Sequence, residues 1–275
     1  MGGGYAPRPL SANITRQARR YQVARRFLEV TSRIWRGAMA WSILYEDAWI
    51  AAVDKPSGLL VTPDRWDKEL VNLVDWVQEN HSPDWRNVHR LDRDTSGIVL
   101  FAKDSESLAA FTALFETREV VKTYSAIVRP APRQTSGVID RPLDADPRRP
   151  GRMRIAVSGK PSRTEWELVE AWRSGAVALI DVHPLTGRTH QIRVHLAAIG
   201  SPVVGDAWYG DGLPLRLSDV KRRFRGVDDG PPLLDRLALH AHSLEFTHPL
   251  TGAACRIESP WPSDFQRAVE RLQRA

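Results

Sequence analysis

The chain has 275 residues and a mass of 31.0 kDa, and its 26% charged and 42% hydrophobic residues are typical of a globular domain with its own core. A single cysteine, Cys255, excludes an intramolecular disulfide and a cysteine-based zinc site, and no apolar run approaches the roughly 18 residues of a membrane-spanning helix. The net charge of +6 is uneven, because residues 1–40 hold eight arginines and one acid, Glu29, so the other 235 residues sum to −1.

The basic segment comes first in the chain. Val23, Phe27, Val30 and Ile34 recur at helical spacing with arginines on the other faces, and Gly37 follows, which predicts a helix over 15–35. A segment of this kind binds nucleic acid by neutralising phosphates, acts as an Arg-rich transit peptide, or is simply a solvated helix. The sequence leaves these three interpretations open.

The next part of the chain, residues 43–128, mixes strand and helix patterns. Alternating or continuous short apolar runs predict strands, and apolar residues at helical spacing predict helices. We expect two strands within 43–58 around an acidic turn, a buried strand at 97–102, a strand at 122–128, and helices over 68–80 and 104–120, the second capped by Asp104 or Ser105.

The remainder begins with residues 130–162, which are rich in Pro, Gly and Arg and predict a long loop or a weak hairpin with a basic surface. After it we expect paired strands at 164–172 and 176–184, a helix over 188–199 with Gly200 at its C-terminal cap, an irregular insert at 209–232, strands at 237–249 and 253–259, and a closing helix over 262–272 capped at Ser263. Because strands and helices do not alternate regularly, the pattern favours an α+β fold with a largely antiparallel sheet, and no boundary divides 41–275.

Several kinds of site are absent or weak in the sequence. It contains no P-loop, no dinucleotide-binding glycine pattern and no G-x-S-x-G elbow. Two histidine pairs, His190 with His195 and His240 with His242, could in principle bind a metal. Their spacing is poor and no cysteine or H-E-x-x-H lies nearby, so we expect histidines that hydrogen-bond within the fold and no metal.

The stretch "HRLDRDTSG" (89–97) places charged residues directly before the predicted buried strand. Loops at the end of a sheet often carry active sites. An aspartate held there needs a partner, and a nearby arginine would keep it ionised, which makes a competent nucleophile. A solvated turn with a Ser or Thr cap is the alternative interpretation of the same residues.

"HRLDRDTSG" resembles the catalytic signature of the RluA family of pseudouridine synthases. Four more stretches resemble the motifs of that family in the expected order: "VDKPSGLLV" (53–61), "KTYSAIV" (122–128), "HPLTGRTHQIRVHLAAIGSPVVGDAWYG" (183–210) and "LALHAHSLEFTHP" (237–249). The resemblance implies the pseudouridine synthase fold, an α+β domain with a mixed, mostly antiparallel sheet, flanking helices and a central RNA-binding cleft. It also implies isomerisation of uridine to pseudouridine in RNA, without a metal or organic cofactor.

The resemblance also implies roles for individual residues. Asp92 would be the catalytic aspartate, paired with Arg193, and Tyr124 would stack on the target base and take part in proton transfer at C5. Arg90 would occupy the space that the flipped nucleotide leaves. His89 and Arg188 complete the expected substrate-binding set. Asp92 could attack C1′ of the ribose, attack C6 of the uracil or promote a glycal intermediate, and the sequence does not choose between these routes.

The division expected from these observations is a basic, helical extension at 1–40, too short for the S4 RNA-binding domain of many relatives, followed by a catalytic domain at 41–275. We expect a cytoplasmic, monomeric enzyme that acts on stem-loops of ribosomal RNA, transfer RNA or both, with no membrane association. Lys221, Arg222, Arg223 and Arg225, in the second insert, are expected to contact RNA phosphates. The alternatives are a catalytically silent RNA-binding module of the same fold, a metal-dependent hydrolase and a structural protein.

Overall fold

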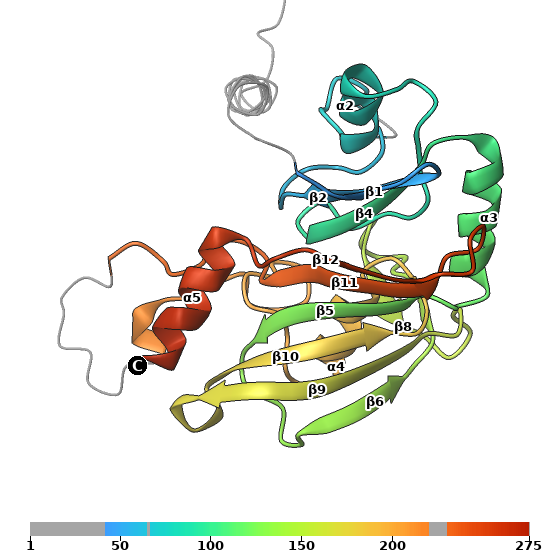
Figure 1. Ribbon diagram of the computed structural model, residues 1–275. Helices are drawn as coiled ribbons and strands as arrows, with labels where there is room; N and C mark the ends of the chain where they lie inside the picture. The colour runs from blue at the N-terminus through green and yellow to red at the C-terminus, as the bar shows by residue number, and fades with distance from the viewer. Residues whose placement is uncertain (1–41, 65–66, 220–229, 275) are drawn as a thin grey trace, which may run out of the picture. The chain divides into compact units, whose positions relative to one another are not determined.

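A computed structural model describes residues 42–64, 67–219 and 230–274 of the chain, and residues 42–275 group into one compact unit. The predicted basic helix at 15–35 and the basic cluster at 221–225 lie outside the described residues. The elements, shown in Figure 1, are β1 (Ile43–Glu46), β2 (Ile50–Lys55), α2 (Leu73–Asn80), β3 (Arg86–Asn87), β4 (Ser96–Ala102), α3 (Ser105–Glu116), β5 (Val121–Val128), β6 (Ser136–Asp140), β7 (Leu143–Ala145), β8 (Met153–Ile155), β9 (Arg163–Trp172), η1 (Arg173–Gly175), β10 (Val177–Pro184), α4 (Gln191–Ala198), η2 (Leu217–Asp219), β11 (Leu239–Thr247), β12 (Ala254–Glu258) and α5 (Ser263–Gln273).

Ten of the described strands form one sheet in the order β1-β2-β4-β11-β5-β10-β9-β6, with β12 also paired to β11 and β3 to β4. Neighbouring strands in it are antiparallel except β4 and β11, which run parallel and pair only through His240 with Ser96 and Ala241 with Gly97. This arrangement confirms the expected α+β class and the mixed, mostly antiparallel sheet. The short parallel pairing joins two halves of the sheet, β1-β2-β4 and β11-β5-β10-β9-β6.

Two hydrophobic cores support the sheet. The larger core joins β5, β9 and β10 to helices α4 and α5, whose buried side chains include Ile192, Leu196, Phe265 and Leu272. The smaller core joins β2, β4, β11 and β12 to α3, and its members are Ile50, Ala52, Ile98, Leu100, Phe111, Leu114, Val120, Leu244, Phe246 and Ile257. The larger core therefore lies within one half of the sheet, whereas the smaller core spans the place where β4 and β11 join the two halves.

Helix ends differ from the sequence prediction in physically clear ways. The helix expected over 68–80 begins only at Leu73, because Asn72 accepts a hydrogen bond from the backbone of Asp75 and the preceding backbone pairs with residue 60. The predicted Asp104 cap of α3 is confirmed, with a capping box to Ser107. The predicted Ser263 cap is wrong. The N-cap of α5 is Pro262, whose side chain has no group that could form a capping hydrogen bond.

The segment 130–162 is more ordered than its Pro, Gly and Arg content suggests. Its strand β6 joins the main sheet beside β9, which the sequence prediction missed. The predicted weak hairpin exists as β7 and β8, paired from Leu143 with Ile155 to Ala145 with Met153. This hairpin carries the exposed basic residues Arg148, Arg149 and Arg154.

Candidate active site

The loop 88–95 joins β3 to β4 and presents Asp92 in a tight turn that the backbone of Thr95 closes by donating to the carbonyl of Asp92. The turn after β2 holds this loop from behind. The Lys55 ammonium donates to the carbonyl oxygens of Pro56, Leu59 and Arg93 at 2.8, 2.8 and 2.9 Å. The first motif of the sequence therefore fixes the backbone of the second.

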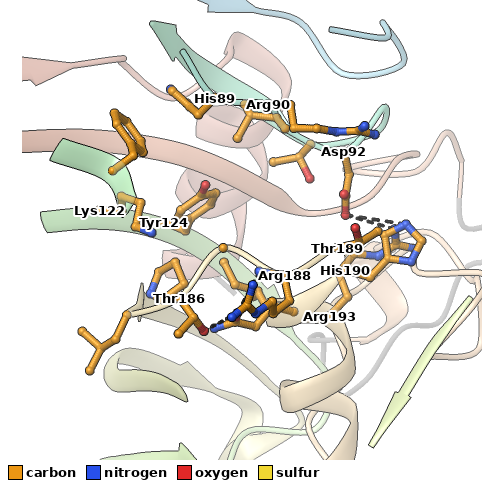
Figure 2. A pocket seen from close by; sticks show the side chains of 18 of the residues that line it. His89, Arg90, Asp92, Lys122, Tyr124, Thr186, Arg188, Thr189, His190 and Arg193 are labelled. Carbon is orange, nitrogen blue, oxygen red and sulfur yellow. Dashed lines mark hydrogen bonds and ion pairs between the residues drawn. The ribbon is translucent and has the colours of Figure 1, made fainter. Parts of the chain in front are cut away.

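A cavity of about 520 Å³ opens beside Asp92. All of the predicted site residues line it, although they come from distant parts of the sequence: His89, Arg90, Asp92, Tyr124, Arg188 and Arg193. Figure 2 shows these side chains around the cavity, with Asp92 facing Arg193 and His190. The structure thus brings together the whole set that the resemblance implied, while their individual roles stay predictions.

Asp92 contacts Arg193 as predicted, but a second carboxylate dominates the surroundings of that arginine. The Arg193 guanidinium donates to Asp92 Oδ2 at 3.4 Å, and to the buried Asp206 at 2.7 and 2.9 Å. Burial alone would raise the pKa of Asp206, but hydrogen bonds from Arg193 and from the backbone of Trp208 and Tyr209 lower it below its usual value. Asp206 therefore holds Arg193 in place for Asp92. The sequence reasoning quoted Asp206 within a motif and gave it no role.

Tyr124 lies on β5 between its partners Ala241 on β11 and Val182 on β10. Burial raises the pKa of the Tyr124 phenol above its usual value, and the negative charge of Asp92 raises it further. The phenol is therefore protonated at neutral pH, and can offer a ring face to a base and a proton on its hydroxyl.

A second cation lies beside Tyr124. Lys122 is two residues away on the same strand, so its side chain is on the same face of β5 and also lines the cavity. Burial, with a smaller contribution from the positive charge of Arg118, lowers the pKa of Lys122 to about 8. Sequence reasoning missed Lys122, although a basic residue two positions before the motif tyrosine on a strand is a readable signal.

The remaining predicted residues occupy different positions in the cavity wall. The His89 ring stacks on Phe115 with 4.7 Å between centroids, and its Nε2 accepts the backbone N–H of Leu100. Burial lowers the pKa of His89 to about 3, so the ring is neutral. Arg90 is exposed, and the Arg188 guanidinium donates to the Pro161 carbonyl.

The histidines considered as metal ligands bind other groups of the fold. His195 is buried, with Nδ1 2.8 Å from the Thr164 hydroxyl, and both His240 and His242 contact the carbonyl of Ser259. In the part of the chain that the structure describes, no group of three or more His, Cys, Asp or Glu side chains is arranged to hold a metal ion. None of the described helices is long and apolar enough to span a membrane.

The sequence pattern of RNA pseudouridylate synthases matches residues 50–198, which is more than half of the chain and includes all the predicted site residues. The chain belongs to the RNA pseudouridylate synthase family. It is therefore an RNA-modifying isomerase, and no observation favours the catalytically silent alternative.

The relatives of this pseudouridine synthase agree with that assignment. It is 36% identical over 239 residues to the ribosomal large subunit pseudouridine synthase D of Xanthomonas campestris pv. campestris, covering 84% of this chain and 69% of that protein. It is 35% identical to the dual-specificity RNA pseudouridine synthase RluA of Escherichia coli K12, covering 81% and 93%. The resemblance to the RluA family is thereby confirmed.

Solved structures support the fold of the synthase. The human RNA pseudouridylate synthase domain-containing protein 1 superposes with a TM-score of 0.62 and 28% identity, covering 81% of this chain and 84% of that chain. The expected pseudouridine synthase fold is confirmed.

Proposed function

We propose that this synthase isomerises a uridine that is flipped out of a stem-loop of ribosomal RNA, transfer RNA or both into the cavity around Asp92. The observation that carries the proposal is the meeting of Asp92, Tyr124 and Arg193 at one cavity of about 520 Å³, a volume within the usual range for a bound small group. The name of one bacterial relative, for the ribosomal large subunit, supports a ribosomal RNA substrate, and the name of the other, for dual specificity, supports more than one RNA substrate.

In the proposed reaction, the N1–C1′ bond of uridine breaks, the uracil turns, and C5 bonds to C1′. The proton that C5 loses leaves the base, and N1 ends with a proton in place of its bond to the ribose. Asp92 starts the reaction as a nucleophile or a base in its ionised form, with Arg193 beside its carboxylate. Tyr124 packs against the base, and because its phenol is protonated at neutral pH it takes the C5 proton only as it gives its own hydroxyl proton to N1 or to water.

Flipping the uridine costs a few kcal/mol of lost stacking, and Arg90 offsets part of this cost by filling the vacated space. The exposed position of Arg90 at the cavity supports this role. His89 and Arg188 are proposed to contact the substrate from the walls of the same cavity. Lys122 adds a positive charge there that suits a phosphate or a uracil oxygen.

We also propose that residues 41–275 form the catalytic domain and that residues 1–40 are a basic extension that assists RNA binding. The enzyme is proposed to be cytoplasmic and monomeric, and to need neither metal nor organic cofactor. Activity that persists in a chelator would support the last point.

Pseudouridine mapping tests the function. Unmodified ribosomal RNA and transfer RNA are incubated separately with the wild type, Asp92→Asn and Asp94→Asn, and then analysed by carbodiimide labelling and primer extension. We expect the same stop with the wild type and Asp94→Asn and no stop with Asp92→Asn, because Asp92 is the one of the two loop aspartates that contacts Arg193. Asp94 is the matched control, since it is an exposed aspartate in the same loop.

The outcomes separate the readings. A stop that persists in Asp92→Asn would overturn the role of Asp92. RNA binding by a folded wild type, without any stop on either RNA, would point to another RNA target.

A further inference from the structure

His190 is a cavity residue to which the reaction above gives no task. It precedes α4 in a left-handed conformation, with φ of 55°, and its Nε2 lies 3.9 Å from Asp92 Oδ2. Figure 2 shows its ring beside Arg193, on the same side of Asp92. Its other ring nitrogen, Nδ1, lies 2.8 Å from the hydroxyl of Tyr209.

The Tyr209 hydroxyl determines which nitrogen of His190 carries the proton. The backbone N–H of Met153 donates to this hydroxyl oxygen at 2.8 Å, so the hydroxyl already accepts one bond. Among the described residues, the only acceptor within hydrogen-bonding distance of its own proton is His190 Nδ1. When Nδ1 accepts, a neutral imidazole must carry its hydrogen on Nε2, which faces Asp92.

The surroundings keep the imidazole neutral and its partner fixed. Burial lowers the pKa of His190; the charge of Asp92 opposes this effect and that of Arg193 adds to it. The Tyr209 ring is held by two guanidinium groups, those of Arg152 at 5.0 Å and Arg193 at 5.2 Å from its centroid.

We propose that Tyr209 fixes His190 in the Nε2–H tautomer, and that His190 is a positioning residue which directs this N–H at Oδ2 of Asp92. The inference rests on the proposed catalytic role of Asp92. Arg193 also approaches Oδ2, and within the described residues no hydrogen bond reaches Oδ1. The two neighbours therefore orient the carboxylate so that Oδ1 is the oxygen presented to the substrate.

The hairpin β7–β8 takes part in this arrangement, because it supplies the Met153 N–H that occupies the Tyr209 oxygen. The purely structural interpretation is that Tyr209 only tethers the hairpin to α4. In that case Tyr209 would not determine the tautomer of His190, and replacing the donor at the Nε2 position would not change kcat.

The first experiment reads the tautomer directly in the full-length protein without RNA. Two-bond proton–nitrogen correlation spectra of ¹⁵N-histidine-labelled enzyme distinguish a protonated ring nitrogen from an unprotonated one, and the spectrum of His190→Asn assigns the signal. We expect Nε2–H in the wild type and in Tyr45→Phe, and a mixture or Nδ1–H in Tyr209→Phe. Tyr45 is the matched control, because its hydroxyl bonds to Asp47 and does not line the cavity. Nδ1–H in the wild type would overturn the proposal whether or not the enzyme is active.

The second experiment compares two substitutions of His190. Glutamine places an amide N–H near the former Nε2, whereas asparagine reaches only the former Nδ1 position and leaves Oδ2 of Asp92 without this donor. We expect kcat to fall roughly tenfold in His190→Asn with KM for RNA within about twofold, and His190→Gln to recover at least about threefold of that loss.

Folding favours the variant that is expected to be less active. Asparagine adopts the left-handed conformation of residue 190 more readily than glutamine does, so low activity in His190→Asn cannot be attributed to a poorer fold. Thermal unfolding of both variants checks this point. Equal kcat values in the two variants, or a higher kcat with asparagine, would reject the positioning role. If the wild type and both His190 variants were all inactive, the proposed RNA substrate would be wrong, and the tautomer experiment would still test the role of Tyr209.

Discussion

Arg193 is the residue on which the site depends most, because it touches two carboxylates from a buried position. Its short contacts are with Asp206, at 2.7 and 2.9 Å, and its longer contact is with Asp92. Two well-formed hydrogen bonds on one side restrict the rotation of the guanidinium. The guanidinium is therefore already oriented so that its remaining N–H group points at Asp92.

Replacing Asp206 by asparagine should cost stability and activity together. Asp206→Asn leaves the buried Arg193 without its main counter-charge, so we expect the free energy of unfolding to fall by roughly 3 kcal/mol. We also expect kcat to fall at least about tenfold, because Arg193 is then free to move toward Asp92. Urea denaturation and single-turnover kinetics measure the two effects.

The control is Asp264→Asn, which breaks an ion pair of similar geometry but greater exposure. Asp264 binds Arg236 at 2.6 and 2.9 Å, with 39% of its side chain exposed against 0% for Asp206. We expect a loss of about 1 kcal/mol or less and no change in kcat. Similar losses in both variants would contradict the importance assigned to burial.

At this scale the sequence predicted which residues meet, but not all of their partners. Asp92, Tyr124 and Arg193 were identified because they stand in recognisable motifs. Asp206 was missed because its pairing joins a helix to a turn thirteen residues later, which no local periodicity encodes. His190 was expected to hydrogen-bond within the fold, but its partner Tyr209 could not be named, since this bond exists only in the folded chain.

Among the elements, the turn that follows β2 supports the loop 88–95, which carries Asp92. Lys55 is fully buried and donates to three carbonyl oxygens, one of them on Arg93 next to Asp92. The backbone N–H of Gly58 donates to the same Arg93 carbonyl, and the Ser57 hydroxyl donates to that of Asp94. Hydrogen bonds from one turn thus hold the two residues that follow Asp92.

Removing the Lys55 amine should therefore weaken the support of the loop that carries Asp92. Lys55→Met keeps the aliphatic stem but leaves three carbonyls without their donor, and we expect the free energy of unfolding to fall by roughly 3 kcal/mol at pH 7. Activity should fall as well, because the loop that carries Asp92 loses its support. The control is Lys160→Met, on an exposed side chain.

The same variant tests a pH dependence. Burial lowers the pKa of Lys55 from 10.5 to about 7, so between these values the unfolded chain holds the proton and the folded chain releases it. Stability should therefore rise with pH from about 7 to 10.5 more steeply in the wild type than in Lys55→Met. Parallel stability curves in urea titrations over this range would show that Lys55 titrates normally.

The hairpin β7–β8 is the element expected to hold RNA outside the cavity. Its exposed Arg148, Arg149 and Arg154 lie on a unit that contacts Tyr209 through the backbone of Met153. Changing the three arginines to glutamine should reduce the magnitude of the slope of log K against log salt by up to about 2.7, since each phosphate contact contributes about 0.7 to 0.9. Filter binding over a salt series measures this slope.

The same charge can be removed from α5 for comparison. Arg267, Arg271 and Arg274 are exposed there, and none of them lines the cavity. We expect a smaller change in slope from their replacement. An equal change would mean that overall charge, and not the hairpin, determines RNA affinity.

Most elements were predictable, because their apolar residues follow the strand or helix period. The strand β9, for example, buries Thr164, Trp166 and Trp172 and exposes residues between them. The strand β6 was missed because its neighbours are rich in proline, glycine and arginine, and only its pairing with β9 makes it a strand. Order at this place comes from a distant partner.

Over the whole molecule, the proposed catalytic residues lie on different halves of the sheet. Asp92 precedes β4, whereas Tyr124 lies on β5 and Arg193 on α4, which packs on the other half. Backbone pairing between the halves is limited, among the described residues, to the two residue pairs of β4 and β11, and the smaller core adds side-chain contacts between β2 and β4 on one side and β11 and β12 on the other. The distance between Asp92 and Arg193 therefore depends in part on this narrow pairing.

Gly97 makes the junction possible, and a methyl group there should open it. A Cβ on Gly97 would lie 2.2 Å from the carbonyl oxygen of Ala241, and its φ is +114°. We expect Gly97→Ala to lose roughly 3 kcal/mol or more of stability, from the clash together with backbone strain. Any folded fraction should show reduced kcat, because the halves that carry Asp92 and Arg193 move apart.

Gly200→Ala is the matched control. Gly200 also has a positive φ, of +80°, but a Cβ there would meet nothing within 4 Å. Only backbone strain remains, so we expect a loss of roughly 1–2 kcal/mol and unchanged kcat. Equal effects from the two substitutions would rule out the clash as the cause.

The glycine at this junction changes how the motif "HRLDRDTSG" should be interpreted. Its fourth residue, Asp92, is the proposed catalytic aspartate, whereas at its last residue, Gly97, another strand passes within contact distance. A pattern search that requires only the reactive residues of the motif would also accept sequences with a larger residue at position 97, in which β4 cannot pair with β11. Gly97 is therefore the residue of the motif that indicates whether β4 can pair with β11, and so whether Asp92 can lie close to Arg193 on α4.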